Sequence, residues 1–135
     1  MSVRATGVET VARSFEAFNA RDVERLLSCT HPECEWFPFR AQLEGASYQG
    51  HTGVRRFLRD MDEDWSAFTI EPVELSRRGD LVVATGHVAG TGRGSGVNID
   101  FLGGFLFELR DELIVRVQSY NEPAEAREAA NAGDQ

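Results

Sequence analysis

The first part of the chain carries apolar residues at the three- and four-residue spacing of an α-helix. Thr6 and Glu9 form the T-x-x-E pattern of a capping box, so an amphipathic helix is predicted over 7–19. Its apolar face consists of Val8, Val11, Ala12, Phe15 and Phe18. Asp22 can cap a second, shorter helix that ends before Pro32. Together the two segments predict a helical hairpin with one apolar face.

A third helix is predicted further along, where apolar residues again fall on one stripe. The stripe consists of Val54, Phe57, Leu58, Met61 and Trp65. Before it, the segment E-C-E-W-F-P-F at 33–39 predicts a short strand with aromatic side chains on both faces, and a loop over 41–50 leads into the helix. The third helix is expected to pack its stripe on a sheet.

From Phe68 onward the period of the apolar residues changes from the helical one to two, which predicts about four strands. Their ranges are 68–76, 81–90, 97–109 and 113–120. The connecting segments R-R-G-D, T-G-R-G-S-G and R-D-E are short or rich in glycine, which favours hairpins and antiparallel pairing. Helices followed by a run of strands indicate an α+β fold.

The length of 135 residues fits one domain over 1–135. Its ordered core is expected over about 6–122, and the Ala- and Glu-rich tail at 123–135 is expected to form one helical turn or to fray.

Five motifs in this order resemble the SnoaL-like group of the nuclear-transport-factor-2-like superfamily, which includes relatives of polyketide cyclases and steroid delta-isomerases. They are F-E-A-F-N-A-R-D (15–22), E-W-F-P (35–38), Y-Q-G-H-T-G-V-R-R-F (48–57), R-G-S-G-V (93–97) and L-I-V-R-V-Q-S-Y-N-E-P-A-E-A (113–126). The resemblance implies a cone of helices packed on a strongly curved antiparallel or mixed sheet, with an apolar pocket at the open end. It also implies a homodimer formed through the sheet. It does not imply one activity, because relatives include isomerases, cyclases, dehydratases, epoxide hydrolases and binding modules.

The charge and the cysteine content of the chain argue against several classes of partner and cofactor. The net charge of −8, with 22 acidic and 14 basic residues, argues against a nucleic acid or an anionic membrane as partner. No apolar run reaches the ~20 residues that span a bilayer, so a cytoplasmic protein is expected. Cys29, His31 and Cys34 supply at most three nearby metal ligands, which favours two reduced thiols over a zinc site. No metal and no organic cofactor is expected.

The acid–base groups that steroid-isomerase relatives use are replaced in this sequence. The resemblance places their first-strand carboxylate at Phe37 or Pro38, their helix tyrosine near Ser14 and their late-strand acid near Gly103. Neither Phe37 nor Pro38 can move a proton, and the tyrosine and the late-strand acid of that mechanism are absent as well. Isomerisation by that route is therefore not expected.

His87 and Asp100 are the remaining catalytic candidates. In a hairpin that turns at Arg93 and Gly94 they lie opposite each other, and the carboxylate would raise the basicity of the imidazole if both face the cone. The alternation around them also fits an exposed cross-strand pair worth a few tenths of a kcal/mol. A bulge or bend at Gly103–Gly104 would decide which alternate residues face inward. Both readings remain open from the sequence.

Large side chains are the candidates for lining a pocket, although each also fits ordinary core packing. They are Trp36, Phe37, Met61, Trp65, Phe105, Phe107 and Tyr120. The expected function is binding of a small apolar or aromatic molecule, with at most cofactor-independent acid–base catalysis of the isomerase, cyclase or hydrolase type. The alternatives are a module that binds or dimerises without catalysis, and a protein whose aromatics fill its own pocket.

Overall fold

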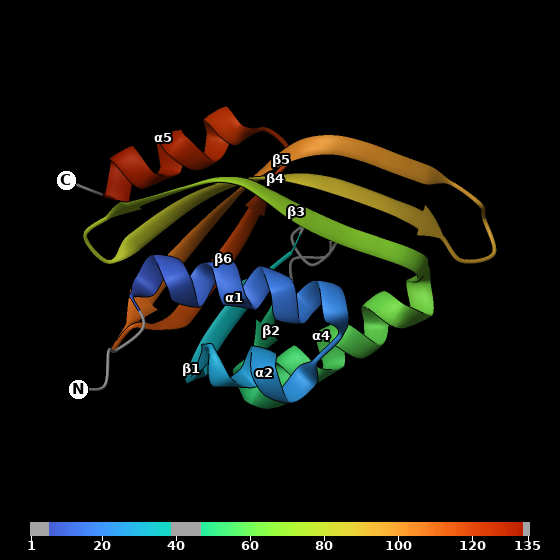
Figure 1. Ribbon diagram of the computed structural model, residues 1–135, viewed down its shortest axis with the longest axis horizontal. Helices are drawn as coiled ribbons and strands as arrows, with labels where there is room; N and C mark the ends of the chain where they lie inside the picture. Colours follow the sequence, from blue (N-terminus) through green and yellow to red (C-terminus); the bar gives the residue numbers. More distant parts are fainter. Residues whose placement is uncertain (1–5, 39–46, 134–135) are drawn as a thin grey trace.

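A computed structural model describes residues 6–38 and 47–133 of the chain (Figure 1). The elements are α1 (Gly7–Ala20), α2 (Val23–Ser28), β1 (Thr30–Phe37), β2 (Tyr48–Gln49), α4 (Gly50–Asp64), β3 (Trp65–Arg78), β4 (Leu81–Gly92), β5 (Asn98–Arg110), β6 (Leu113–Tyr120) and α5 (Pro123–Gly133). One sheet contains all six strands in the order β2-β1-β6-β5-β4-β3. β1 runs parallel to β6, and every other neighbouring pair is antiparallel.

Helices cover both faces of this curved, unclosed sheet. Figure 1 shows α1, α2 and α4 on one face, which we call the inner face, and α5 on the opposite, outer face. The α+β prediction with a curved mixed sheet is confirmed. Within 6–38 and 47–133, no helix is both long and apolar enough to cross a membrane.

The ends of the first two helices are fixed by side chains that the sequence pattern identifies. Thr6 and Glu9 form the reciprocal capping box at the start of α1, and the Asp22 carboxylate accepts the backbone N–H of Arg25 at the start of α2. Between them Arg21 takes a left-handed conformation with φ of 55°, which ends α1 and turns the chain into α2. The predicted helical hairpin is thus confirmed.

Three boundaries differ from the prediction. β1 begins at Thr30 and includes Pro32, which the strand tolerates because its register with β6 is irregular between Thr30 and Glu35. Trp65 begins β3 instead of ending the third helix. Of the predicted loop over 41–50, residues 41–46 lie outside the described residues, and the remainder includes the strand β2.

The tail is also more ordered than predicted. It forms the helix α5, an 11-residue segment, instead of a single turn or a frayed end. Ala126 and Ala130 are fully buried where α5 packs on β5 and β4, and Val83 of β4 completes this small cluster. Small residues at a four-residue spacing let the helix lie close to the sheet, which the composition of the tail did not reveal.

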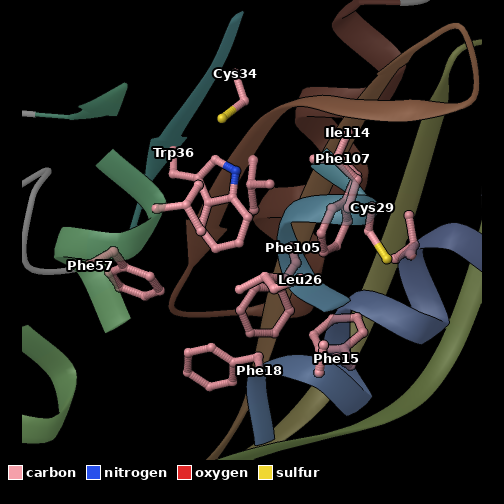
Figure 2. Close-up of a cluster of buried hydrophobic side chains, with 14 of the residues drawn as sticks. Phe15, Phe18, Leu26, Cys29, Cys34, Trp36, Phe57, Phe105, Phe107 and Ile114 are labelled. Atoms are coloured by element: carbon pink, nitrogen blue, oxygen red, sulfur yellow. The ribbon is translucent and has the colours of Figure 1, made fainter. Parts of the chain in front are cut away.

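The main core lies on the inner face, between the sheet and the helices α1, α2 and α4. Figure 2 shows its aromatic part, in which Phe15 of α1 meets Phe105 and Phe107 of β5 edge to face, at centroid distances of 5.7 and 5.5 Å. Phe18 stacks on Phe57 of α4 at 5.9 Å. The aromatic rings therefore join α1 and α4 to the middle of the sheet.

Candidate functional site

A cavity of about 460 Å³ lies on the inner face, between α1, α4 and the strands β3 and β5. Its lining includes side chains of Phe18, Tyr48, Phe57, Asp60, Met61, Asp64, Trp65, Phe68, Ile70, Ser95, Val97, Ile99, Phe101, Phe105, Ser119 and Asn121. A smaller pocket of about 60 Å³ adjoins it and shares Phe18, Phe57 and Phe105 with it. Figure 2 shows these three side chains within the cluster of buried hydrophobic residues.

The strand β5 supplies alternate residues to the cavity, as the period of two predicts. Ile99, Phe101 and Phe105 line it, whereas Asp100 and Leu102 are exposed on the outer face. The same parity continues through the two glycines, because Gly103 and Gly104 pair with β4 without a register shift. Of the two predicted alternatives at Gly103–Gly104, the bulge is therefore wrong, and the bend stays a prediction.

The glycine pair has a packing role instead. A methyl group on Gly104 would lie 2.9 Å from the Ala126 side chain and 2.9 Å from the Glu122 carbonyl oxygen, so the absence of a side chain lets α5 approach the strand. The sequence gives the same Gly-Gly signal for a bulge and for a close helix contact. Only the position of α5 in the structure distinguishes these two explanations.

His87 and Asp100 contact each other, but not in the predicted register. His87 lies opposite Leu102 and Asp100 opposite Ala89, because the hairpin turn is centred one residue later than predicted. The imidazole Nε2 reaches Asp100 Oδ1 diagonally across the strands. The turn is displaced because Gly94 and Gly96, with φ of 85° and 69°, both take left-handed conformations in a longer loop.

This pair lies on the outer face of the sheet. The side chains of His87 and Asp100 are 47% and 72% exposed, and neither lines the cavity. This placement agrees with the second interpretation of the sequence, an exposed cross-strand pair. A catalytic role for the pair stays a prediction without support from the geometry of the cavity.

Most of the predicted pocket residues lie at the cavity or at the adjoining pocket. Met61, Trp65 and Phe105 line the larger cavity. Trp36, Phe37 and Phe107, together with Phe105, line the smaller pocket. The roles of these residues in binding remain predictions.

Tyr120 is the exception among the predicted pocket residues. Val117 and Ser119 of β6 point to the inner face, so Tyr120 points to the outer face and packs against the cluster under α5. Partial burial there raises the pKa of the Tyr120 phenol. The prediction that it lines the pocket is not supported, because it rested on the size of the side chain, which does not tell which face of β6 carries it.

Sequence reasoning missed the polar part of the lining. Asp60 and Asp64 are four residues apart on α4 and both line the cavity. Tyr48 of β2 also lines it, and its hydroxyl donates to Asp60 Oδ2 at 2.6 Å. The spacing of Asp60 and Asp64 with Phe57 and Met61 on one helical side was an available signal.

The remaining chemistry-bearing side chains lie away from the cavity. Burial raises the pKa of the Cys29 and Cys34 thiols. His51 Nε2 lies 2.8 Å from the carbonyl oxygen of Thr30 and joins the start of α4 to β1. Across residues 6–38 and 47–133, no group of three or more His, Cys, Asp or Glu residues is arranged to hold a metal ion.

Comparison with known proteins identifies the family of this architecture. Residues 11–117 match the model of the SnoaL-like domain. An NTF2-like protein of unknown function from Burkholderia pseudomallei superposes with a TM-score of 0.78 at 22% identity, over 90% of this chain and 95% of that one. TerC, co-crystallised with polyporic acid, superposes with a TM-score of 0.77 at 24% identity, over 92% of this chain and 97% of that one.

A putative polyketide cyclase from Pseudomonas putida gives a TM-score of 0.74 at 20% identity, over 87% of this chain and 92% of that one. Among curated protein sequences, none matches significantly. At these identities the solved structures establish the fold, and the family model covers most of the chain. This protein belongs to the SnoaL-like family and has its NTF2-like fold.

Proposed function

We propose that this protein binds a small aromatic molecule in the cavity between α1, α4 and the inner face of the sheet. The observation that carries the proposal is the cavity volume of about 460 Å³ together with its aromatic lining. Sites for small molecules commonly have volumes of roughly 300–1,000 Å³, mostly apolar walls and a few polar groups. This lining has that composition.

The aromatic lining of the cavity favours a flat ring system. Phe18 and Phe57 form one wall, Phe101 and Phe105 of β5 contribute to another, and Trp65 contributes near the end of α4. Aromatic rings interact favourably with such walls in stacked or edge-to-face arrangements. The adjoining 60 Å³ pocket exceeds the roughly 10–15 Å³ needed by a water, so it can admit a ligand substituent.

The structural relatives support the same class of ligand. TerC was crystallised with polyporic acid, and the protein from Pseudomonas putida is a putative polyketide cyclase. Both therefore point toward aromatic or polyketide-like molecules. At 24% and 20% identity they support this proposal through the fold and not through shared site residues.

A cavity-filling substitution tests the proposal. Ile99→Trp places an indole in the cavity, whereas Asn98→Trp, the matched control, places one on the exposed outer face of the same strand. In a thermal-shift assay with naphthol as the probe, the wild type and Asn98→Trp should be stabilised by a saturating concentration. Ile99→Trp should show a much smaller shift. Equal shifts in all three proteins, or none in any, would contradict binding in the cavity.

A second candidate function is cofactor-independent proton transfer of the isomerase or cyclase type. It is favoured by the carboxylates of Asp60 and Asp64, which line an otherwise largely apolar cavity. The test is deuterium exchange at the carbon next to the carbonyl of tetralone in heavy water, followed by NMR. The wild type should accelerate the exchange and Asp60→Asn should not. No acceleration by the wild type would count against base catalysis on this ketone and would leave ligand binding unaffected.

A further inference from the structure

Tyr48 and Asp60 form a hydrogen-bonded pair in the wall of the cavity. They are 12 residues apart, on β2 and on α4, and the Tyr48 hydroxyl donates to Asp60 Oδ2 at 2.6 Å. Both residues line the cavity. The pair therefore places a carboxylate and a phenol oxygen where a ligand can meet them.

The ring of Tyr48 is held in place from two sides. It packs edge to face on Phe57 at 5.2 Å, and the Arg56 guanidinium lies 5.1 Å from its centroid. Gly53 allows this approach, because a side chain there would lie 2.8 Å from the Tyr48 carbonyl carbon. The phenol is thus preorganised by α4 itself.

Asp60 is half-buried and forms no ion pair within the described part of the chain. One carboxylate oxygen, Oδ2, accepts from Tyr48, and no described donor reaches Oδ1. An ionised carboxylate only accepts hydrogen bonds, and a phenol whose hydrogen is already donated offers only its lone pairs. The cavity wall at this point therefore presents acceptors to a ligand.

Resting on the proposed function, we propose that the Tyr48–Asp60 pair selects aromatic ligands that carry a hydroxyl group, phenols or enols, over ligands that carry only acceptors. A ligand hydroxyl donates to Asp60 Oδ1 while its ring lies against Phe57. A ketone or an ether at the same place removes water from the carboxylate without replacing the hydrogen bond. The loss of a hydrogen bond to a charged group corresponds to roughly a tenfold or greater weakening of binding.

Calorimetric titration of three probes that share one ring system tests this selectivity. Naphthol donates a hydrogen bond, whereas methoxynaphthalene and acetonaphthone only accept. The wild type should bind naphthol about tenfold or more tightly than the other two. Equal affinities for the three probes in the wild type would overturn the proposal while leaving the proposed cavity binding intact.

Substitutions of the pair give the second half of the test. Asp60→Asn replaces an acceptor by a group that can also donate, so the preference for naphthol should vanish or reverse toward acetonaphthone. Tyr48→Phe frees Asp60 Oδ2 and should change affinities without reversing the order. Glu63→Gln is the matched control, because it removes one negative charge from α4, as Asp60→Asn does, but at an exposed position. It should keep the wild-type preference. An unchanged preference in Asp60→Asn would overturn the proposal.

The outcomes separate this inference from the function on which it rests. If none of the three probes binds the wild type, both are overturned, because neither ring nor hydroxyl is recognised. If the probes bind and Ile99→Trp abolishes their binding, the cavity is the site, and only the ranking of the probes decides the role of Tyr48 and Asp60. If Asp60→Asn fails to fold, the rankings by the wild type and by Tyr48→Phe decide it.

Discussion

Asn19 holds the end of α1 against the edge strand β3 through both ends of its amide. Its Nδ2 donates to the Ile70 carbonyl at 2.8 Å, and the Ile70 N–H donates to its Oδ1 at 2.9 Å. Among the described strands, β3 has a neighbour only on the side of β4, so the side chain replaces a strand partner on the open edge. Because Ile70 lines the cavity, this contact also fixes one of its walls.

Replacing Asn19 by Ala should lower the free energy of unfolding by about 1–3 kcal/mol, because two hydrogen bonds to a half-buried backbone are lost. Urea denaturation measures the change. Asn98→Ala, which removes one exposed side-chain contact, serves as control and should stay within about 0.5 kcal/mol. Equal effects of the two substitutions would contradict the role of Asn19.

The two buried thiols predict that the stability of the folded chain depends on pH. Burial raises the pKa of Cys29 and Cys34 above the ordinary value of 9.0, so both are neutral in the folded chain at neutral pH. Above pH 9.0 the unfolded thiols ionise before the folded ones, and stability falls as the pH rises through that window. Below it their contribution is fully present.

An aromatic disulfide reagent at pH 8 should accordingly react slowly with the native protein and rapidly, at two thiols per chain, in urea. Cys29→Ser and Cys34→Ser each remove one thiol, so the two variants show which cysteine gives which reaction. Fast reaction of both thiols in the native state would show that they are not buried.

At the scale of residues, the sequence predicted what depends on near neighbours. The capping box of Thr6 and Glu9 and the cap at Asp22 involve partners three residues away, so spacing alone identifies them. The partner of Asn19 lies 51 residues further along the chain and has no local signal.

At the scale of elements, too, some features could be predicted from the sequence and others could not, and β5 is the clearest case. Its alternation correctly separates Ile99 and Phe101 from the exposed Asp100, because a period of two requires no knowledge of the partner strand. Its pairing with β4 depends on the turn, and the predicted register was wrong by two residues, which keeps the faces but changes the opposite residues. The loop glycines permit several turn geometries, so the sequence did not fix the register.

The close packing of α5 on the sheet requires that residue 104 has no side chain. A single added methyl group at this position should therefore disturb the packing. Gly104→Ala should destabilise the protein and loosen α5, because the added carbon meets backbone atoms at 2.9 and 3.0 Å that cannot move independently. Gly103→Ala is the adjacent control, since its nearest contact is a phenyl carbon at 3.3 Å. Limited proteolysis and thermal denaturation measure the effects. A smaller loss in Gly104→Ala than in Gly103→Ala would contradict this account.

The whole molecule presents one sheet face to the cavity and the other to α5 and its surroundings. Leu102 is 47% exposed on the outer face, near His87 and Asp100. Following the family resemblance, we propose that two chains associate through this face. Light scattering should then report twice the chain mass, and Leu102→Glu should reduce it to that of one chain. A monomeric wild type would contradict the proposal.

The position of His87 and Asp100 predicts that they do not affect binding in the cavity. Asp100→Asn should leave the affinity for naphthol unchanged and alter stability by a few tenths of a kcal/mol, as expected for an exposed cross-strand pair. Loss of binding or of proton transfer in this variant would restore the catalytic interpretation.

The cavity itself could be predicted only through the family. The aromatic residues of α1, α4 and β5 give the same pattern whether they fill a core or surround a space, because both require apolar inward faces. The difference lies in how closely the helices approach the sheet, which no local pattern records. Phe15 and Phe107 pack edge to face and line only the smaller pocket, whereas Phe18 and Phe105 line the larger cavity as well.

The most direct test of the proposed site is NMR of methyl groups on the two faces of β5 during titration with naphthol. Ile99 lines the cavity and Leu102 lies on the outer face of the same strand, so ring currents from a bound naphthol should shift the Ile99 methyl signals and leave those of Leu102 nearly unchanged. The Met61 methyl should move with Ile99. Shifts confined to Leu102, or equal on both faces, would contradict an aromatic ligand site in the cavity.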